Sequence, residues 1–156
     1  MEFNLILRNF LIYDKIISGF QSEEESHEFS RFYLFRWLWN AEFDIQAFCA
    51  SLRDRYSGVT IREENDHEKA YRLLWDYQSP EVSVEGALNR KNDVFVINYF
   101  DSKNRLQDYA AYILWLREWF PSDQKVLFCD EGYTKIFPLP HDISTKEIEM
   151  KLHNEG

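Results

Sequence analysis

The chain has 156 residues and a formal net charge of −9, with 27 aspartates and glutamates against 18 lysines and arginines. Binding to nucleic acid draws most of its affinity from lysine and arginine, so this balance argues against nucleic acid as a partner and favours a basic protein. The length and an apolar share of 45% are enough for a full hydrophobic core, and we expect a single domain over residues 1–156.

Cysteine usage and hydropathy bear on the compartment. Cys49 and Cys129 lie far apart, without the spacing of a metal site, which is typical of a protein in a reducing compartment. Charged residues interrupt the apolar N-terminal stretch, so we expect no signal peptide there. The longest uncharged apolar stretch, residues 109–116, is too short to span a bilayer. We therefore expect a cytoplasmic protein without a membrane partner.

Three segments of the N-terminal quarter carry a pattern. Apolar and polar residues alternate over residues 3–7, which predicts a strand with one buried face. The polar residues 21–28 predict an exposed loop, although Ser22 and Glu25 also fit a helix capping box. Aromatic residues at alternate positions favour a strand over residues 29–39, and a helix buried on all sides stays open as the alternative.

Helical periodicity is clearest in two later segments. Apolar residues spaced i, i+3, i+4, i+7 and i+11 predict a helix over residues 41–56, with Asn40 available as a cap. A broader apolar face predicts a helix over residues 105–120 that packs on more than one side and ends at Pro121. The core positions expected on that helix include Leu106, Ile113, Trp115 and Leu116.

Capping signals predict two further helices. Asn65 or Asp66 can cap a helix that runs to Tyr77 and ends before a Ser-Pro pair. Ser144 can cap a short terminal helix, with Glu147 at the capping-box position.

The remaining apolar segments predict short strands. They cover residues 59–63, 82–86, 93–100, 125–129 and 133–137, the last two joined by a hairpin-like turn at 130–132. These strands mix with the helices without strict β-α-β alternation, which favours an α+β fold. We expect a single compact domain in which helices pack on a mixed, largely antiparallel sheet.

One pair of segments has the residue types of a metal-dependent nuclease. Glu81 follows Pro80, and Asp101 and Lys103 come at the end of a predicted strand, as in the PD-(D/E)xK pattern. In that chemistry two acidic groups hold a divalent cation and the lysine assists the nucleophile. Residues 101–104 are otherwise typical of an ordinary polar turn between a strand and a helix, which is the interpretation we prefer.

No other pattern in the sequence points to catalysis or metal binding. The histidines lack metal-ligand spacing, and no glycine-rich phosphate loop occurs. Cys129 precedes Asp130 and Glu131, whose negative charges disfavour a reactive thiolate, so we expect a buried structural cysteine. We therefore expect no enzyme, no metal site and no cofactor, but a protein that acts by binding.

Acidic side chains gather in three clusters, which are the candidates for a binding surface. Residues 23–25 lie in the expected exposed loop, whereas residues 63–66 flank an expected strand-to-helix connection and residues 130–131 occupy the expected hairpin turn. Loops anchored by rigid elements are common binding sites, and an aromatic neighbour adds an apolar anchor. We assign partner binding to the two anchored clusters. The candidate residues are Glu63, Glu64, Asp66, Asp130, Glu131 and Tyr133.

Two parts of the chain resemble a known class of proteins. Residues 109–152 combine an aromatic helix, a Phe-Pro stop, a strand that ends in CDEGY and a return through FPL. Together with residues 31–48 (RFYLFRWLWNAEFDIQAF), this part resembles small bacterial immunity proteins of contact-dependent growth inhibition and related polymorphic toxin systems. The resemblance implies a compact cytosolic protein that neutralises one cognate toxin domain by binding it. It implies no catalytic residues and transfers no site residue.

The leading hypothesis is therefore an immunity protein that binds and blocks a basic toxin domain, which we expect to be a nuclease. The first alternative is a metal-dependent nuclease that uses Glu81, Asp101 and Lys103. The second is a non-catalytic accessory or oligomerisation domain with an aromatic interface. A toxin domain encoded immediately upstream would favour the leading hypothesis over both alternatives.

Overall fold

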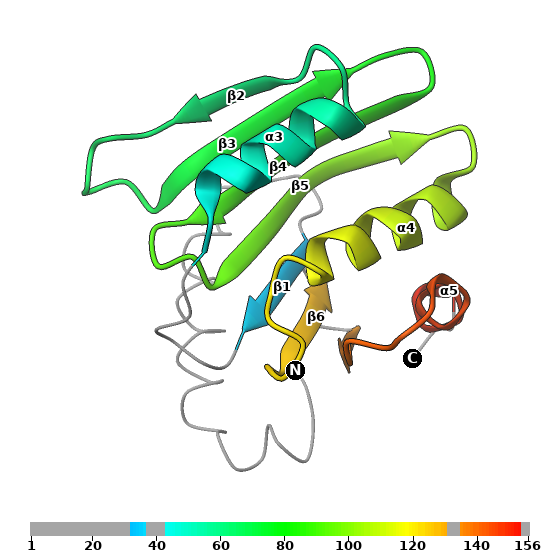
Figure 1. Cartoon of the computed structure of the whole chain (residues 1–156). Coiled ribbons are helices and arrows are strands. Elements are labelled where there is room, and N and C mark those ends of the chain that lie inside the picture. The colour runs from blue at the N-terminus through cyan, green and yellow to red at the C-terminus, as the bar shows by residue number, and fades with distance from the viewer. Residues whose placement is uncertain (1–31, 37–42, 131–134, 154–156) are drawn as a thin grey trace.

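The computed structural model describes residues 32–36, 43–130 and 135–153, and these form one antiparallel sheet with three helices. The strand order is β2-β3-β4-β5-β1-β6-β7, and every described pair is antiparallel (Figure 1). This confirms the predicted α+β class. The strands are β1 (Phe32–Arg36), β2 (Thr60–Glu63), β3 (Tyr71–Gln78), β4 (Val82–Asn89), β5 (Val94–Ser102), β6 (Val126–Asp130) and β7 (Ile136–Pro138), and the helices are α3 (Ile45–Arg55), α4 (Arg105–Arg117) and α5 (Thr145–His153).

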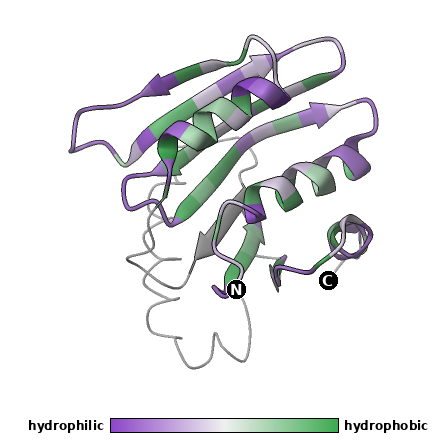
Figure 2. Ribbon diagram, in the orientation of Figure 1, coloured by the Kyte–Doolittle hydropathy of each residue, from purple (hydrophilic) through white to green (hydrophobic). Residues whose placement is uncertain are grey.

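The described helices lie on one side of the sheet. In Figure 1, α3 lies in front of β3 and β4, while α4 lies beside β5 and next to α5. Hydrophilic residues gather in the connections between strands, and hydrophobic residues line the strands and the inner sides of the helices (Figure 2). None of these three helices has the length and hydropathy needed to span a membrane.

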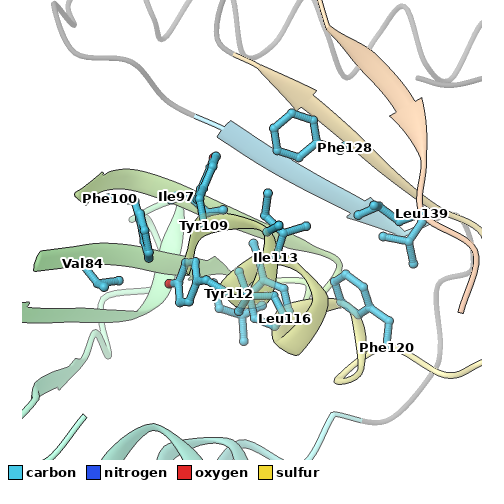
Figure 3. Close-up of a cluster of buried hydrophobic side chains, with 14 of the residues drawn as sticks. Val84, Ile97, Phe100, Tyr109, Tyr112, Ile113, Leu116, Phe120, Phe128 and Leu139 are labelled. Carbon is cyan, nitrogen blue, oxygen red and sulfur yellow. The ribbon is translucent and has the colours of Figure 1, made fainter. Parts of the chain in front are cut away.

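The core between the helices and the sheet is rich in aromatic rings. Phe48 of α3 is fully buried and packs against Trp75 of β3 and Phe95 of β5, with ring centroids 5.2 and 5.4 Å away. The Nε1 atom of Trp75 donates a hydrogen bond to the hydroxyl of Tyr112 on α4 at 3.0 Å. Figure 3 shows Ile113 of α4 in the same cluster. One aromatic network therefore joins both long helices to the sheet.

The two strongest helix predictions are confirmed, with corrected ends. α3 begins at Ile45, and the side chain of Asp44 caps it by accepting from the Ala47 backbone N–H at 3.0 Å. Asp44 therefore takes the place of the predicted cap, Asn40, which lies outside the described residues. α4 ends at Arg117, three residues before the predicted end, and Leu106 is 38% exposed, so its assignment to the core is wrong. This residue lies in the first turn of α4, shortly after the end of β5.

The capping box at the last helix is confirmed. The Ser144 hydroxyl accepts from the Glu147 backbone N–H at 3.1 Å, and the Glu147 carboxylate accepts from the Ser144 backbone N–H at 2.9 Å. This reciprocal arrangement satisfies two backbone donors at the start of α5.

The helix predicted over residues 65–77 is wrong. Residues 71–78 form β3, which pairs with β2 on one side and β4 on the other. Apolar residues at 71, 74 and 77 have helical spacing, but those at 71, 73, 75 and 77 also have strand spacing. The strand prevails because Leu73 and Trp75 gain partners on both sides and bury their side chains under α3. The acidic residues 63–66 therefore begin a connection between two strands.

The other strand predictions differ mainly in their ends. The strand preferred for residues 29–39 is confirmed over Phe32–Arg36. β4 extends to Asn89, and β5 continues through Asp101 and Ser102, which were expected in a turn. β6 and β7 pair as expected. The strand predicted at 3–7 and the loop or helix at 21–28 lie outside the described residues.

Candidate binding surface

The β2–β3 connection, residues 64–70, is held by one arginine from a neighbouring turn. Arg90 follows β4 and inserts its guanidinium between the ends of this connection. Its Nη2 atom donates to the backbone carbonyls of Glu64, Asp66 and Tyr71 at 3.0, 2.9 and 3.2 Å. Its Nε atom donates to the carbonyl of Lys69 at 3.0 Å. Four carbonyl contacts from one side chain fix the path of the acidic connection.

The turn that carries Arg90 is itself ordered by local contacts. The Asn89 side chain accepts from the backbone N–H groups of Asp93 and Val94 at 2.9 and 3.0 Å. Asn92 has φ of 60°, a left-handed conformation that asparagine tolerates better than most residues. The sequence Asn-Arg-Lys-Asn-Asp therefore forms a tight turn with Arg90 directed toward the acidic connection.

Two of the predicted binding residues use their carboxylates to build the connection. Glu64 accepts from the backbone N–H of Asp66 at 3.1 Å and from Arg62 Nη1 at 3.3 Å. Asp66 accepts from the backbone N–H of Glu68 at 3.0 Å. Glu63 and Glu68 are exposed, and within the described residues their carboxylates make no hydrogen bond or ion pair. The carboxylates most available to a partner are therefore those of Glu63 and Glu68.

Asp130 has a structural role at the end of β6. Its Oδ1 atom accepts from the Lys135 backbone N–H at 3.0 Å, and its own backbone N–H donates to the Lys135 carbonyl at 3.0 Å. These contacts close the β6–β7 hairpin. The Lys135 Nζ atom in turn donates to the Leu152 carbonyl of α5. Glu131 and Tyr133 lie outside the described residues.

The structure does not bring the two predicted clusters together. β2 and β6 are separated by β3, β4, β5 and β1 in the sheet order. Five inter-strand steps correspond to about 24 Å at the usual strand spacing. A small partner domain that contacts Glu63 and Glu68 would not reach Asp130 with the same loop.

A further acidic pair lies on the sheet face opposite the helices. Asp76 of β3 is paired directly with Glu85 of β4, and Glu85 is paired with Tyr99 of β5. Both carboxylates are exposed and Tyr99 is 46% exposed. Like charges directly opposite one another destabilise a sheet, and a basic partner would relieve the repulsion. Sequence reasoning missed this pair because the helix predicted over 65–77 removed β3 from the sheet.

The residues of the nuclease pattern do meet in space. Glu81, Asp101 and Lys103 line one shallow groove of about 190 Å³, and Lys103 Nζ lies 3.4 Å from Glu81 Oε2. The pair is open to solvent, with side chains 70% and 69% exposed. Within the described part of the chain, no group of three or more His, Cys, Asp or Glu side chains is placed to hold a metal ion.

Another groove lies around a buried arginine of α4. Arg117 is 1% exposed, and its guanidinium donates to the carbonyls of Leu139, Phe120 and Gln124 at 2.6, 3.2 and 3.0 Å. Burial lowers the pKa of this guanidinium. The groove of about 510 Å³ runs along residues 122–127 and 138–141. Arg117 therefore joins the end of α4 to the segment that follows β7.

The remaining titratable groups in the core are structural. Burial raises the pKa of the Tyr109 and Tyr112 phenols, and it raises the pKa of the Cys49 thiol. Neutral phenols and thiols are therefore the stable forms. Cys129 is fully buried in β6, as expected for a structural cysteine. No protein-family model, curated protein or solved structure matches the chain.

Proposed function

We propose that the protein is a non-catalytic inhibitor of the immunity-protein type, which binds and blocks a basic toxin domain through the β2–β3 connection. The observation that carries this proposal is a pair of exposed carboxylates, Glu63 at the end of β2 and Glu68 in the connection that follows. Four hydrogen bonds from Arg90 hold this connection. The proposal includes a cytoplasmic location, with which two buried cysteines that form no disulfide are compatible.

Rigidity of the acidic connection supports binding more than charge alone does. A loop that is already ordered loses little conformational entropy when a partner binds, so more of the electrostatic gain appears as affinity. Opposite charges across an interface also speed association and favour the correct partner over others. The net charge of −9 adds attraction at longer range for a basic domain.

The direct test is binding to a toxin domain encoded beside the gene of this protein, with matched charge reversals. Glu63→Lys with Glu68→Lys should slow association strongly and reduce its dependence on salt, because these carboxylates make no internal contact in the described part of the chain. Charge reversals at Glu64, Asp66 or Asp130 are less informative because those side chains hold the backbone.

The control carries the same change in net charge at a distant site. Asp123→Lys with Asp142→Lys alters two exposed aspartates on the β6–β7 side of the sheet. If binding uses the β2–β3 connection, this control retains most of the association rate of the wild-type protein. Unchanged affinity in the Glu63 and Glu68 variant, at low and at physiological salt, would exclude this surface. Equal losses in both double variants would indicate attraction by net charge only.

One observation favours a second candidate function. The three residues of the nuclease pattern line the same groove, although they come from the β3–β4 turn, β5 and the residue after β5. Against this function, the lysine that would assist a nucleophile, Lys103, forms an ion pair with Glu81. Hydrolysis of DNA or RNA by purified protein in the presence of Mg²⁺ or Mn²⁺ distinguishes this function from inhibition by binding.

A further inference from the structure

The guanidinium of Arg117 is a buried cation that no described carboxylate neutralises. The residue is 1% exposed, and the ion pairs between described residues all involve other side chains. Its hydrogen bonds go to backbone carbonyls, those of Leu139, Phe120, Pro121 and Gln124. An unpaired charge is costly to bury, so a buried cation normally has an anion beside it. Arg117 therefore lacks a counter-charge in the described part of the chain.

Two polar groups at this position also lack hydrogen-bond partners. A guanidinium has five N–H groups, and the four carbonyls leave one Nη2 N–H of Arg117 without an acceptor among the described residues. Gln124 is 8% exposed, and its buried Oε1 atom accepts no hydrogen bond from them. Buried polar atoms in native proteins nearly always have a partner, so each exception needs an explanation. A ligand that offers both an acceptor and a donor would satisfy this pair.

Both residues line one groove beside the end of α4. This groove has a volume of about 510 Å³ and runs along residues 122–127 and 138–141. A second groove of about 370 Å³, along residues 117–122, shares Arg117, Ser122 and His141 with it. Sites for small ligands usually have volumes of roughly 300–1,000 Å³. The groove with Gln124 is therefore large enough for an organic molecule rather than a single ion.

The lining of this groove reverses the charge balance of the chain. Arg117, Lys125 and His141 line it together with one carboxylate, that of Asp123, whereas acidic residues outnumber lysines and arginines by 27 to 18 in the whole sequence. Lys125 and His141 are exposed, and their side chains form no ion pair with a described residue. The apolar part of the lining consists of Val126, Leu127, Pro138, Leu139 and Pro140. An organic anion with an apolar part fits this lining.

We propose that the groove binds a carboxylate with an N–H donor next to it, as in an amino acid or in the C-terminal residue of a peptide. The carboxylate supplies the counter-charge and the acceptor that Arg117 lacks, with Lys125 as a second cation. The N–H group supplies the donor that Gln124 Oε1 lacks. An apolar side chain of the ligand packs on the apolar part of the lining.

Binding includes a small rearrangement at the rim of the groove. Arg117 and Gln124 are almost fully covered, whereas Ser122, Lys125 and His141 are exposed. Exposed side chains change rotamer within picoseconds to nanoseconds, so the rim residues can turn aside for a ligand. Entry of a ligand should therefore change the surroundings of the Gln124 side chain, whose amide is observable by NMR.

NMR titration of the isotope-labelled full-length chain tests the proposal. Leucine represents a free amino acid and N-acetyl-leucine the end of a peptide, and each is compared with its amide, which lacks the carboxylate. We expect at least one acid to cause saturable shifts at the Gln124 side-chain amide and at residues 122–127, with a Kd at least about tenfold below those of its amide and of acetate. The acid that binds more tightly identifies the source of the ligand. Equal binding of acid and amide, equal binding of acetate, or no saturable shift with either acid up to about 10 mM would overturn the proposal.

Variants of the groove give a second measurement. The Gln124 carbonyl accepts from Arg117, so Gln124→Glu places a carboxylate close to this guanidinium, where it supplies the missing charge and repels the ligand. We expect this variant to fold and to lose affinity for the acid by at least about tenfold. Lys125→Ala should lower the affinity by roughly threefold to fivefold, whereas Arg105→Ala, an exposed charge at the other end of α4, should change it little. Unchanged affinity in folded Gln124→Glu, or equal losses in the Lys125 and Arg105 variants, would also overturn the proposal.

Discussion

The substitution Gly86→Ala tests the central contact of the core. Gly86 of β4 is paired with Trp75 of β3, and the indole of Trp75 lies across the glycine. A Cβ atom at position 86 would lie 2.5 Å from the Cε2 and Cζ2 atoms of the indole. Carbon atoms in contact are normally 3.5–4.0 Å apart, so either the indole or the strand must move by about 1 Å.

The indole has little freedom to move. Trp75 is 2% exposed, its ring packs on Phe48 at 5.2 Å, and its Nε1 atom donates to the Tyr112 hydroxyl. Overpacking of a core costs roughly 1–3 kcal/mol, and loss of the hydrogen bond adds roughly 0.5–1.5 kcal/mol. The reduced freedom of the unfolded chain offsets roughly 0.4–1 kcal/mol of this. We expect Gly86→Ala to lower the free energy of unfolding by about 2–3 kcal/mol.

Urea unfolding followed by circular dichroism measures this change. Glu85→Ala, at the adjacent and exposed position, serves as a control and should change stability by less than about 0.5 kcal/mol. In a Trp75→Phe background, which removes the atoms that meet the new methyl group, Gly86→Ala should cost at least about 1 kcal/mol less. A full cost in both backgrounds, or a cost below about 0.5 kcal/mol in the wild type, would refute the steric argument.

Three further predictions concern the core, the pH dependence and the activity. Ile113→Ala, at a fully buried position of α4, should cost roughly 2–5 kcal/mol in urea unfolding, whereas Leu106→Ala on the exposed side of the same helix should cost under about 1 kcal/mol. Burial raises the pKa of Tyr112, so the unfolded chain releases this phenol proton first and stability should fall above about pH 10, by up to about 1.4 kcal/mol per pH unit. A Tyr112→Phe variant should lose part of this slope, and an unchanged urea midpoint from pH 8 to 11 would contradict the assignment. Purified protein should not cleave DNA or RNA with Mg²⁺, and cleavage that Asp101→Ala abolishes but Asp76→Ala retains would establish the nuclease instead.

Local patterns in the sequence were sufficient for the elements that depend on neighbours along the chain. The amphipathic period of residues 45–55 and the capping box at Ser144 and Glu147 predict α3 and α5 because helix formation uses contacts within four residues. The hairpin of β6 and β7 follows from a polar turn between two apolar runs. The class of fold could be predicted because it depends on these elements and their order.

Patterns that depend on distant partners were not sufficient. β3 could be identified only from its pairing with β2 and β4, since its sequence fits both a strand and a helix. The role of Arg90 was invisible for the same reason, because its carbonyl partners lie 19 to 26 residues away in the chain. The acidic clusters were chosen by charge, and the structure separates carboxylates that hold the backbone from carboxylates that face solvent. The two kinds of carboxylate cannot be told apart from the sequence, because the difference depends on which backbone N–H groups lie near each side chain in the folded chain.

The use of arginine in this protein links the fold to the proposed function. Arg90 and Arg117 both donate to backbone carbonyls, so neither neutralises a carboxylate. The ion pairs within the described residues are exposed or short-range contacts, Arg62 with Glu64 and Lys103 with Glu81. Such pairs stabilise a fold by less than about 1 kcal/mol each. Within the described residues these two arginines thus stabilise connections without pairing with a carboxylate, and the carboxylates of Glu63 and Glu68 stay open to solvent.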